Sequence, residues 1–248
     1  MSGHSHWATI KHKKGAIDAK RGKLFSKLSR AIIIAARHGG GDPETNLKLR
    51  YAIDKAREVS MPKDNIERAV KRGTGETEGV TFEEITYEGY GPGGVAFLVD
   101  VLTDNRNRTN SEIRKIFERS GGKMGSAGNV GFLFERKGTF SIDASATDED
   151  TLMSIALDAG ADDLKRAGSS FEITCDPAAF NQVKEALQKN NLTPTFAEIS
   201  QVPKVPREVD TEVGKKVMRL MEALDDHDDV QNVYADANIT EAMVAEAG

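Results

Sequence analysis

Apolar residues recur at helical spacing in the N-terminal part of the chain. From about residue 16 they fall three, four and seven positions apart, which places them along one side of a helix; they are Ile17, Leu24, Leu28, Ile32 and Ala35. Glycines at 39–41 end this helix. A second helix is predicted with Asp42 as its cap and Pro43 at its first position, and a third from about Met61 to Gly73. Together they predict a small bundle with a thin core, which we expect to dock on the rest of the chain.

Beyond residue 80 the pattern changes to apolar runs of strand length, separated by further helical stripes. Strands are predicted at 82–90, 95–102, 130–135, 139–142, 170–175, 195–199 and 230–235. Helices are predicted from a cap at Thr109 or Asn110 to Gly121, and at 148–159, 177–189 and 209–223. The sequence EGYGPGG at 88–94 predicts a hairpin turn, and 202–206 predicts a linker.

These elements predict an α+β protein of three domains. Residues 1–78 form a basic helical domain, a three-helix bundle; 79–136 and 205–248 form a discontinuous α/β domain; and 137–204 form an α/β domain inserted into it. The insertion is the simplest topology in which the last helix and strand complete the middle unit. Both α/β units are expected to resemble split β-α-β folds of the ferredoxin-like type.

The charge of the chain is unevenly distributed. The formal net charge is −5 overall, yet residues 1–72 hold 17 Lys or Arg against 7 Asp or Glu, a net of +10. The remaining residues hold 17 basic against 32 acidic side chains, a net of −15. A basic segment on an acidic body is typical of a module that binds polyanions.

Within that segment, basic residues form a second stripe on the first helix. Lys20, Lys23, Lys27, Arg30 and Arg37 recur three, four and seven positions apart, beside the apolar stripe. A solvated helix face usually interleaves acids with its bases. Such acids are missing from this stripe, so the like charges repel, and we expect the stripe to contact nucleic acid or the ribosome rather than water alone.

The first fifteen residues, MSGHSHWATIKHKKG, predict a flexible or extended arm. Its single Trp could stack on a base or dock the arm onto the helices. A metal site at its histidines is disfavoured because no Cys or carboxylate lies nearby. The candidate nucleic-acid-binding residues of arm and helix are His6, Trp7, Lys11, Lys13, Lys14, Lys20, Arg21, Lys23, Lys27 and Arg30.

Enzymatic chemistry finds little support in the sequence. The glycine-rich turn at 88–94 matches no phosphate-binding motif. Cys175 is the sole cysteine and is read as a small buried residue. The run 225–229, DDHDD, lacks the pattern of a calcium loop and predicts a solvated helix-to-strand turn. Arg106 and Arg108 lie on a predicted loop and could contact phosphate or be structural. No catalytic residues, cofactor, metal site, signal peptide or long apolar segment are predicted, and the expected location is the cytoplasm.

Several long blocks of the sequence resemble the YebC/PmpR family. They are GHSHWATIKHKKGAIDAKRGKLFSKLSRAI, MPKDNIERAVKRGTGE, YEGYGPGGVAFLVDVLTDNRNRT and DDVQNVYADANI, in that order. The stretch KMGSAGNVGFLF at 123–134 fits less well, with Gly128-Asn129-Val130 where members usually have Gly-Ser-Val. The resemblance implies a helical domain followed by two α/β domains. It also implies a cytoplasmic transcriptional regulator that binds DNA, whereas other members, such as the mitochondrial translational activator of cytochrome oxidase, look like ribosome-associated translation factors.

Two binding functions are therefore carried forward. In the first, the chain is a non-enzymatic DNA-binding regulator whose basic helix lies on the phosphate backbone, although no helix-turn-helix pattern accounts for base readout. In the second, it is an RNA-binding translation factor on the ribosome, whose arm enters an RNA-rich cleft. The expected partners are DNA or ribosomal RNA, with no membrane and no small-molecule substrate evident. An enzyme with a cleft between the α/β domains is the disfavoured third reading.

Overall fold

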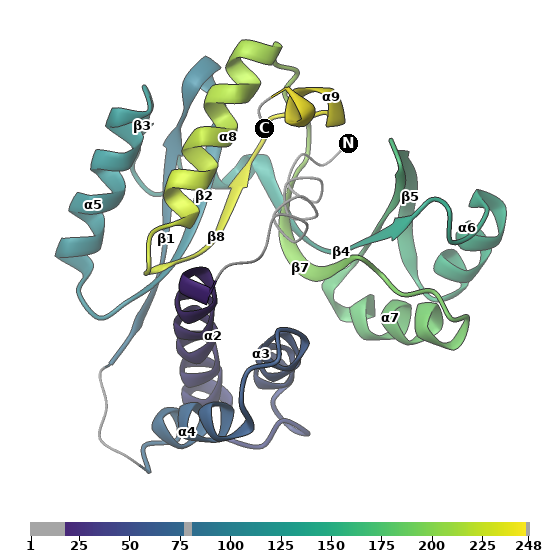
Figure 1. Cartoon of the computed structure of the whole chain (residues 1–248), viewed down its shortest axis with the longest axis horizontal. Helices are drawn as coiled ribbons and strands as arrows, with labels where there is room; N and C mark the ends of the chain where they lie inside the picture. Colours follow the sequence, from purple (N-terminus) through teal and green to yellow (C-terminus); the bar gives the residue numbers. More distant parts are fainter. Residues whose placement is uncertain (1–17, 77–80, 247–248) are drawn as a thin grey trace.

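The computed structural model describes residues 18–76 and 81–246. The N-terminal helical region, residues 18–76, contains α2 (Asp18–Gly39), α3 (Leu47–Glu58) and α4 (Lys63–Gly73), and α2 packs against both of the others (Figure 1). Its buried residues include Ile32, Leu49 and Ile66. Helices α2 and α4 approach closely because Gly73 has no side chain, since a Cβ there would lie 2.5 Å from the carbonyl oxygen of Ile33. The isoleucine run of α2 is helical and buried, as its helical neighbours predicted.

The second helix begins later than predicted. Residues 42–45 form a turn in which the Asp42 carboxylate accepts from the backbone N–H of Glu44, and α3 starts at Leu47. Its N-cap is Asn46, whose Oδ1 accepts from the backbone N–H of Leu49. The buried amide nitrogen of Asn46 also donates to the carbonyl oxygens of Ala35 and Gly40. These tertiary hydrogen bonds select Asn46 over Asp42 as the cap.

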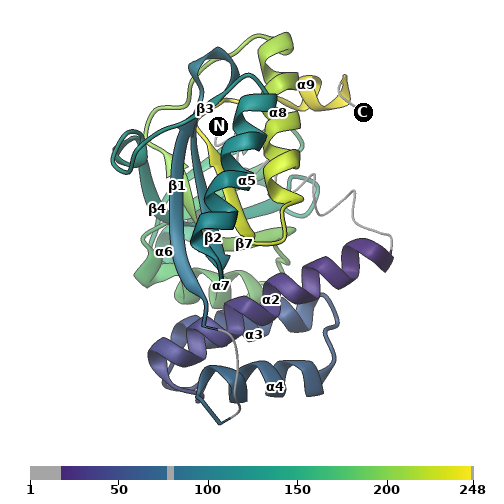
Figure 2. The same cartoon turned by 90° about the vertical axis from the view of Figure 1, so that its left-hand side faces the viewer.

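The first sheet is four-stranded, with the order β3-β1-β2-β8. Its strands are β1 (Glu83–Tyr90), β2 (Ala96–Thr103), β3 (Lys123–Met124) and β8 (Val230–Ala235), and neighbours are antiparallel. The helices α5 (Arg106–Arg119) and α8 (Thr211–Asp225) cover one face of this sheet (Figure 2). The predicted hairpin turn is confirmed, because Pro92–Gly94 forms a short 3-10 turn between the paired strands β1 and β2.

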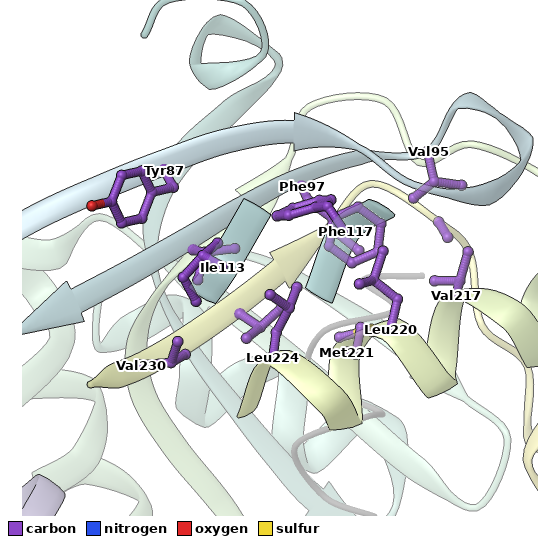
Figure 3. Close-up of a cluster of buried hydrophobic side chains, with 14 of the residues drawn as sticks. Tyr87, Val95, Phe97, Ile113, Phe117, Val217, Leu220, Met221, Leu224 and Val230 are labelled. Atoms are coloured by element: carbon purple, nitrogen blue, oxygen red, sulfur yellow. The ribbon is translucent and has the colours of Figure 1, made fainter. Parts of the chain in front are cut away.

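Between this sheet and its helices lies the largest apolar core (Figure 3). Phe97 of β2 and Phe117 of α5 meet edge to face, with ring centroids 5.8 Å apart, and both are fully buried. Leu220 and Leu224 of α8 pack from the other helix. The continuous apolar run of β2 is therefore explained by burial on both of its faces.

The second sheet is also four-stranded and antiparallel, with the order β5-β6-β4-β7. Along the chain it reads β4 (Phe134–Asp143), α6 (Glu149–Asp158), β5 (Ala161–Ala167), β6 (Ser170–Cys175), a 3-10 turn (Pro177–Ala179), α7 (Phe180–Lys189) and β7 (Phe196–Pro203). This β-α-β-β-α-β sequence with that strand order is the split β-α-β arrangement predicted for the unit. Cys175 is buried on β6 as expected, and burial raises the pKa of its thiol to about 11.

Several predicted boundaries in this part of the chain are wrong. The separate strands at 130–135 and 139–142 are one strand, β4, which follows a 3-10 turn at 131–133. Strand β7 extends into the predicted linker because it pairs with the start of β4, as far as Pro203 opposite Phe134. Strands β3 and β5 and helix α9 (Glu241–Ala245) were not predicted; the first and last are short, and β5 carries four charged residues among its seven.

The chain thus folds as an α+β protein, a helical region followed by two antiparallel sheets with their helices. Strand β8 returns to the first sheet after the second sheet is complete, which is the connection that an inserted domain requires. The division at residues 78, 136 and 204 remains a prediction. Its second boundary falls inside β4, which begins beside the first sheet and continues into the second.

Candidate nucleic-acid interface

Only part of the predicted binding surface lies where the structure describes side chains. His6, Trp7, Lys11, Lys13 and Lys14 lie outside the described residues. Lys20 and Arg21 lie near the start of α2. The structure brings together the remaining three candidates, Lys23, Lys27 and Arg30, because each forms an ion pair with one short segment far away in the sequence. Their contribution to nucleic-acid binding remains a prediction.

That segment is the acidic turn, residues 225–229, which joins α8 to β8 above the first turns of α2 (Figure 1). Lys23 lies 3.7 Å from the carboxylate of Asp228 and donates to a backbone carbonyl of the turn at 3.3 Å. Lys27 contacts both the backbone oxygen and the carboxylate of Asp225. For Lys23, Lys27 and Arg30, the acidic partners that the basic stripe lacks within its own helix are therefore supplied by the acidic turn, 198 residues away in the Lys27 pair.

The contact withdraws two of the three cations from solvent. The side chains of Lys27 and Arg30 are 13% and 21% exposed, whereas that of Lys23 is 55% exposed. The prediction that residues 225–229 form a helix-to-strand turn is confirmed, and the prediction that the turn is solvated holds only for part of it, because Asp226 and Asp228 are exposed whereas Asp225 is half-buried. Its last carboxylate, Asp229, is 3% exposed, because α2 and α5 both pack against it.

Asp229 is the centre of a buried polar cluster. Its carboxylate accepts from the hydroxyl of Thr109 at 2.7 Å, from the guanidinium of Arg108 at 2.7 Å and from the hydroxyl of Thr103 at 3.2 Å. The guanidinium of Arg30 lies 3.0 Å from its other oxygen. Burial alone would raise the pKa of this carboxyl, but the hydrogen bonds and positive charges outweigh burial and lower the pKa. Asp229 is therefore an ionised anchor between α2, α5 and the first sheet.

This cluster also changes the interpretation of the arginines at 106 and 108. They lie in the first turn of α5 rather than on a loop, because the helix is capped by Asn105, whose side chain accepts from the backbone N–H of Arg108. Thr109, one of the predicted caps, is instead buried inside the helix and directed at Asp229. Arg108 has a structural role here, since it pairs with both Asp104 and Asp229. The sequence gives no signal for this cluster, because its members lie in three separate segments.

A further set of cations lies on the outer surface of the helical region. Arg37, Lys48, Lys71 and Arg72 are exposed, and none has an ion-pair partner among the residues that the structure describes. Arg37 belongs to α2, Lys48 to α3 and the other two to the last turn of α4. The basic character of the region is thus divided between a face that is neutralised by the acidic turn and cations that remain open to a ligand.

The helical region also contacts the second sheet and its helices. The hydroxyl of Tyr51 on α3 donates to Asn181 on α7 at 2.8 Å, and the Tyr51 ring meets Phe180 edge to face. Lys55 pairs with Glu198 of β7. The basic helices therefore touch both sheet units, through contacts that are largely polar or ionic.

The loop at 125–130, which lies within the stretch 123–134, is organised by one carboxylate. Glu88 of β1 accepts from the backbone N–H groups of Gly128 at 2.7 Å, Val130 at 2.6 Å and Gly131 at 2.9 Å. Partial burial raises the pKa of Glu88, but these hydrogen bonds exceed that effect and lower it. The loop is thereby fixed to the edge of the first sheet.

We expect Glu88→Ala to lower the free energy of unfolding by about 2 kcal/mol, because three backbone donors lose a charged acceptor. Urea unfolding monitored by circular dichroism measures this, with Glu83→Ala on the same strand as the control, since Glu83 is exposed. Because the pKa of Glu88 is lowered in the folded protein, the difference in free energy of unfolding between the wild type and Glu88→Ala should be constant at pH values above the ordinary Glu pKa of about 4.3. It should shrink as the pH falls below that value. Equal losses from the two substitutions would contradict this role for Glu88.

Among the described residues, no group of three or more His, Cys, Asp or Glu side chains is placed to hold a metal ion. None of the helices in residues 18–76 or 81–246 has the length and apolar character needed to cross a membrane.

Comparison with known proteins gives one consistent result. A family model described as the TACO1/YebC protein N-terminal domain matches residues 5–76, and one described as the TACO1/YebC second and third domain matches residues 82–237. A probable transcriptional regulatory protein of Dictyoglomus turgidum is 54% identical over 98% of both chains. One from Natranaerobius thermophilus is 53% identical over 98% of this chain and 99% of its own. The crystal structure of a conserved hypothetical protein, Aq1575, from Aquifex aeolicus is 48% identical, with a TM-score of 0.84 over 95% of this chain and 98% of that one.

Proposed function

Because the chain belongs to the TACO1/YebC family, we propose that it is a DNA-binding regulator of transcription that acts in the cytoplasm without catalysing a reaction. The names of its relatives support the regulatory part of the proposal. The DNA-binding part rests on the concentration of positive charge in residues 1–72.

One observation carries the choice of surface. Lys23, Lys27 and Arg30 stand four and three residues apart on a single face of α2, and each extends to an anionic group of the acidic turn. At 1.5 Å per residue they are spaced by about 6 Å and 4.5 Å along the helix axis. A row of cations on this scale suits a sugar-phosphate backbone, whose contacts give affinity and position but little sequence information.

An RNA-binding translation factor on the ribosome is the second candidate. It is favoured by the composition of the arm, in which Trp7 lies among His6 and Lys11, Lys13 and Lys14. Aromatic and cationic side chains in one short segment suit unpaired bases, which stack on aromatic rings. The two candidates differ in target and in the part of the chain that makes the main contact.

The test compares the helix with the arm. Fluorescence anisotropy would measure binding to a short labelled duplex DNA and to a single-stranded RNA of equal length, and sedimentation would measure binding to purified ribosomes. Lys23→Gln with Lys27→Gln removes two helix charges, and Lys11→Gln with Lys13→Gln removes two arm charges. Lys115→Gln with Lys189→Gln is the control, since both residues are exposed and lie outside the N-terminal region.

We expect the helix variant to weaken DNA binding about tenfold or more and to reduce the slope of log K against log salt by about 2, while the control changes neither. Preferential binding to RNA or ribosomes that is lost in the arm variant would favour the translation candidate instead. The proposal fails if the wild-type protein binds none of the three probes at low salt.

A further inference from the structure

The acidic turn offers α2 the same kind of acceptors that a nucleic acid would offer. Lys27 meets the carboxylate and the backbone oxygen of Asp225, and Arg30 meets the carboxylate of Asp229 and the backbone oxygen of Asp228. Lys23 is likewise placed between a carboxylate and a carbonyl oxygen. Each cation thus meets two oxygen acceptors, as it would at a phosphate group.

The two kinds of ligand cannot occupy this face together. In the Lys27–Asp225 pair the side chains are 13% and 20% exposed, so a phosphate has little room at the lysine while the turn is in place. The guanidinium of Arg30 is similarly covered. An incoming backbone must therefore displace the acidic turn from α2 in order to use these cations.

The helical region is built so that it can move away from the turn as a unit. The buried residues of its core, which include Ile32, Leu49 and Ile66, all lie within 32–69. From outside the region, the partly buried Phe82, just before β1, packs against this core. Its links to the second sheet unit are ionic or polar at Lys55–Glu198 and Tyr51–Asn181, with one aromatic contact at Phe180. Interfaces of this polar kind between parts of one chain permit relative motion, because little apolar surface is exposed when they open.

We propose that the acidic turn is an internal competitor for nucleic acid, so that the basic face of α2 binds either residues 225–229 or a sugar-phosphate backbone, but not both. The inference rests on the proposed function and adds its regulation. In a closed molecule the acidic turn contacts α2 and neutralises Lys27 and Arg30. Only open molecules can bind nucleic acid through this face, so the apparent affinity falls as the closed fraction rises. The acidic turn thereby excludes polyanions that bind weakly. It favours polyanions that also contact the exposed cations of the helical region, such as Lys71 and Arg72.

The test removes negative charge from the turn and leaves its anchor intact. Asp225→Asn with Asp228→Asn retains the backbone oxygens and Asp229. The control is Asp158→Asn with Glu185→Gln, which raises the net charge by the same amount at two exposed positions of the second sheet unit. Binding of labelled duplex DNA and of single-stranded RNA would be measured by anisotropy at about 0.15 M salt, where long-range effects of net charge are screened.

We expect the turn variant to bind about 5- to 10-fold more tightly than the wild type, because the ion pairs of Asp225 and Asp228 no longer compete, and the control to change little. Equal affinities of the turn variant and the control would overturn the inference while leaving the proposed function standing. If neither wild type nor variant binds DNA or RNA, the proposed function fails and the inference fails with it.

Hydrogen exchange on the wild-type protein gives an independent readout that needs no variant. Within the turn, the amides of Asp226 and His227 are bonded to carbonyl oxygens at the end of α8. Saturation with the DNA or RNA probe should increase exchange in peptides covering 222–230, because the turn loses its contact with α2. Added protection of these peptides would mean that nucleic acid binds without displacing the turn, which contradicts the competition.

Discussion

Asp229→Ala is expected to lower the free energy of unfolding by about 3 kcal/mol, because a buried, ionised acceptor is removed from several donors at once. The hydroxyls of Thr103 and Thr109 are fully buried, and each would lose its bond to the carboxylate. The guanidinium groups of Arg108 and Arg30 would also lose a partner, though both retain contact with solvent, which limits the loss. Chemical denaturation at neutral pH measures the change.

The matched control is Asp228→Ala, which makes the same chemical change one residue earlier. Its side chain is 64% exposed and lies 3.7 Å from Lys23, so we expect a loss below about 1 kcal/mol. Similar losses at 228 and 229 would mean that the buried cluster is not the source of stability.

The contribution of Asp229 to the free energy of unfolding should depend on pH. The pKa of Asp229 is lowered in the folded protein, so its contribution is complete above the unfolded value of about 3.9 and is lost as the pH falls through the lower folded value. The stability difference between wild type and Asp229→Ala should therefore be constant near neutrality and should narrow in acid below about pH 4. A difference that widened on acidification would contradict an ionised Asp229.

Periodicity along the sequence predicted most elements because each helix or strand carries its own apolar pattern. It failed where a distant residue decides the local structure. Asn46 caps α3 because its amide also reaches Ala35, and Thr109 lies within α5 because its hydroxyl is held by Asp229. Capping preferences alone rank Asp42 as highly as Asn46 for α3, and Asn110 as highly as Asn105 for α5. Helix starts of this kind follow from tertiary hydrogen bonds, which have no signature in the adjacent sequence.

The candidate site shows the same limit in its charges. Sequence alone identifies a stripe of cations on α2 without acids beside them, and it identifies the DDHDD run separately. Only the fold shows that the two neutralise each other, through pairs such as Lys27–Asp225. The uneven charge of the chain is thus both a reason to expect a polyanionic ligand and the basis of an internal substitute for it.

Phe180→Ala is expected to lower the free energy of unfolding by about 3–5 kcal/mol, because it leaves a cavity in the core of the second sheet unit. The Phe180 ring is 2% exposed and stacks on Phe140, with centroids 4.7 Å apart. A Cβ at Gly138 would lie 2.8 Å from Phe180, so the ring fills a space that the strand leaves open for it. Since the same ring meets Tyr51 edge to face, the cavity also adjoins the contact with α3.

Phe132→Ala is the matched control, because Phe132 is 64% exposed and the same truncation there should cost less than about 0.5 kcal/mol. Urea titration of both variants measures their free energies of unfolding, and the difference between the two losses gives the effect of the buried cavity apart from that of the Phe→Ala change itself. The docking of the helical region gives a second readout, because loss of the Phe180–Tyr51 contact should increase hydrogen exchange in peptides of α3 under native conditions. If Phe180→Ala destabilises the second sheet unit without affecting α3, the aromatic contact does not help to hold the helical region. The polar contacts at Tyr51–Asn181, at Lys55–Glu198 and at the acidic turn are then the main contacts that hold it.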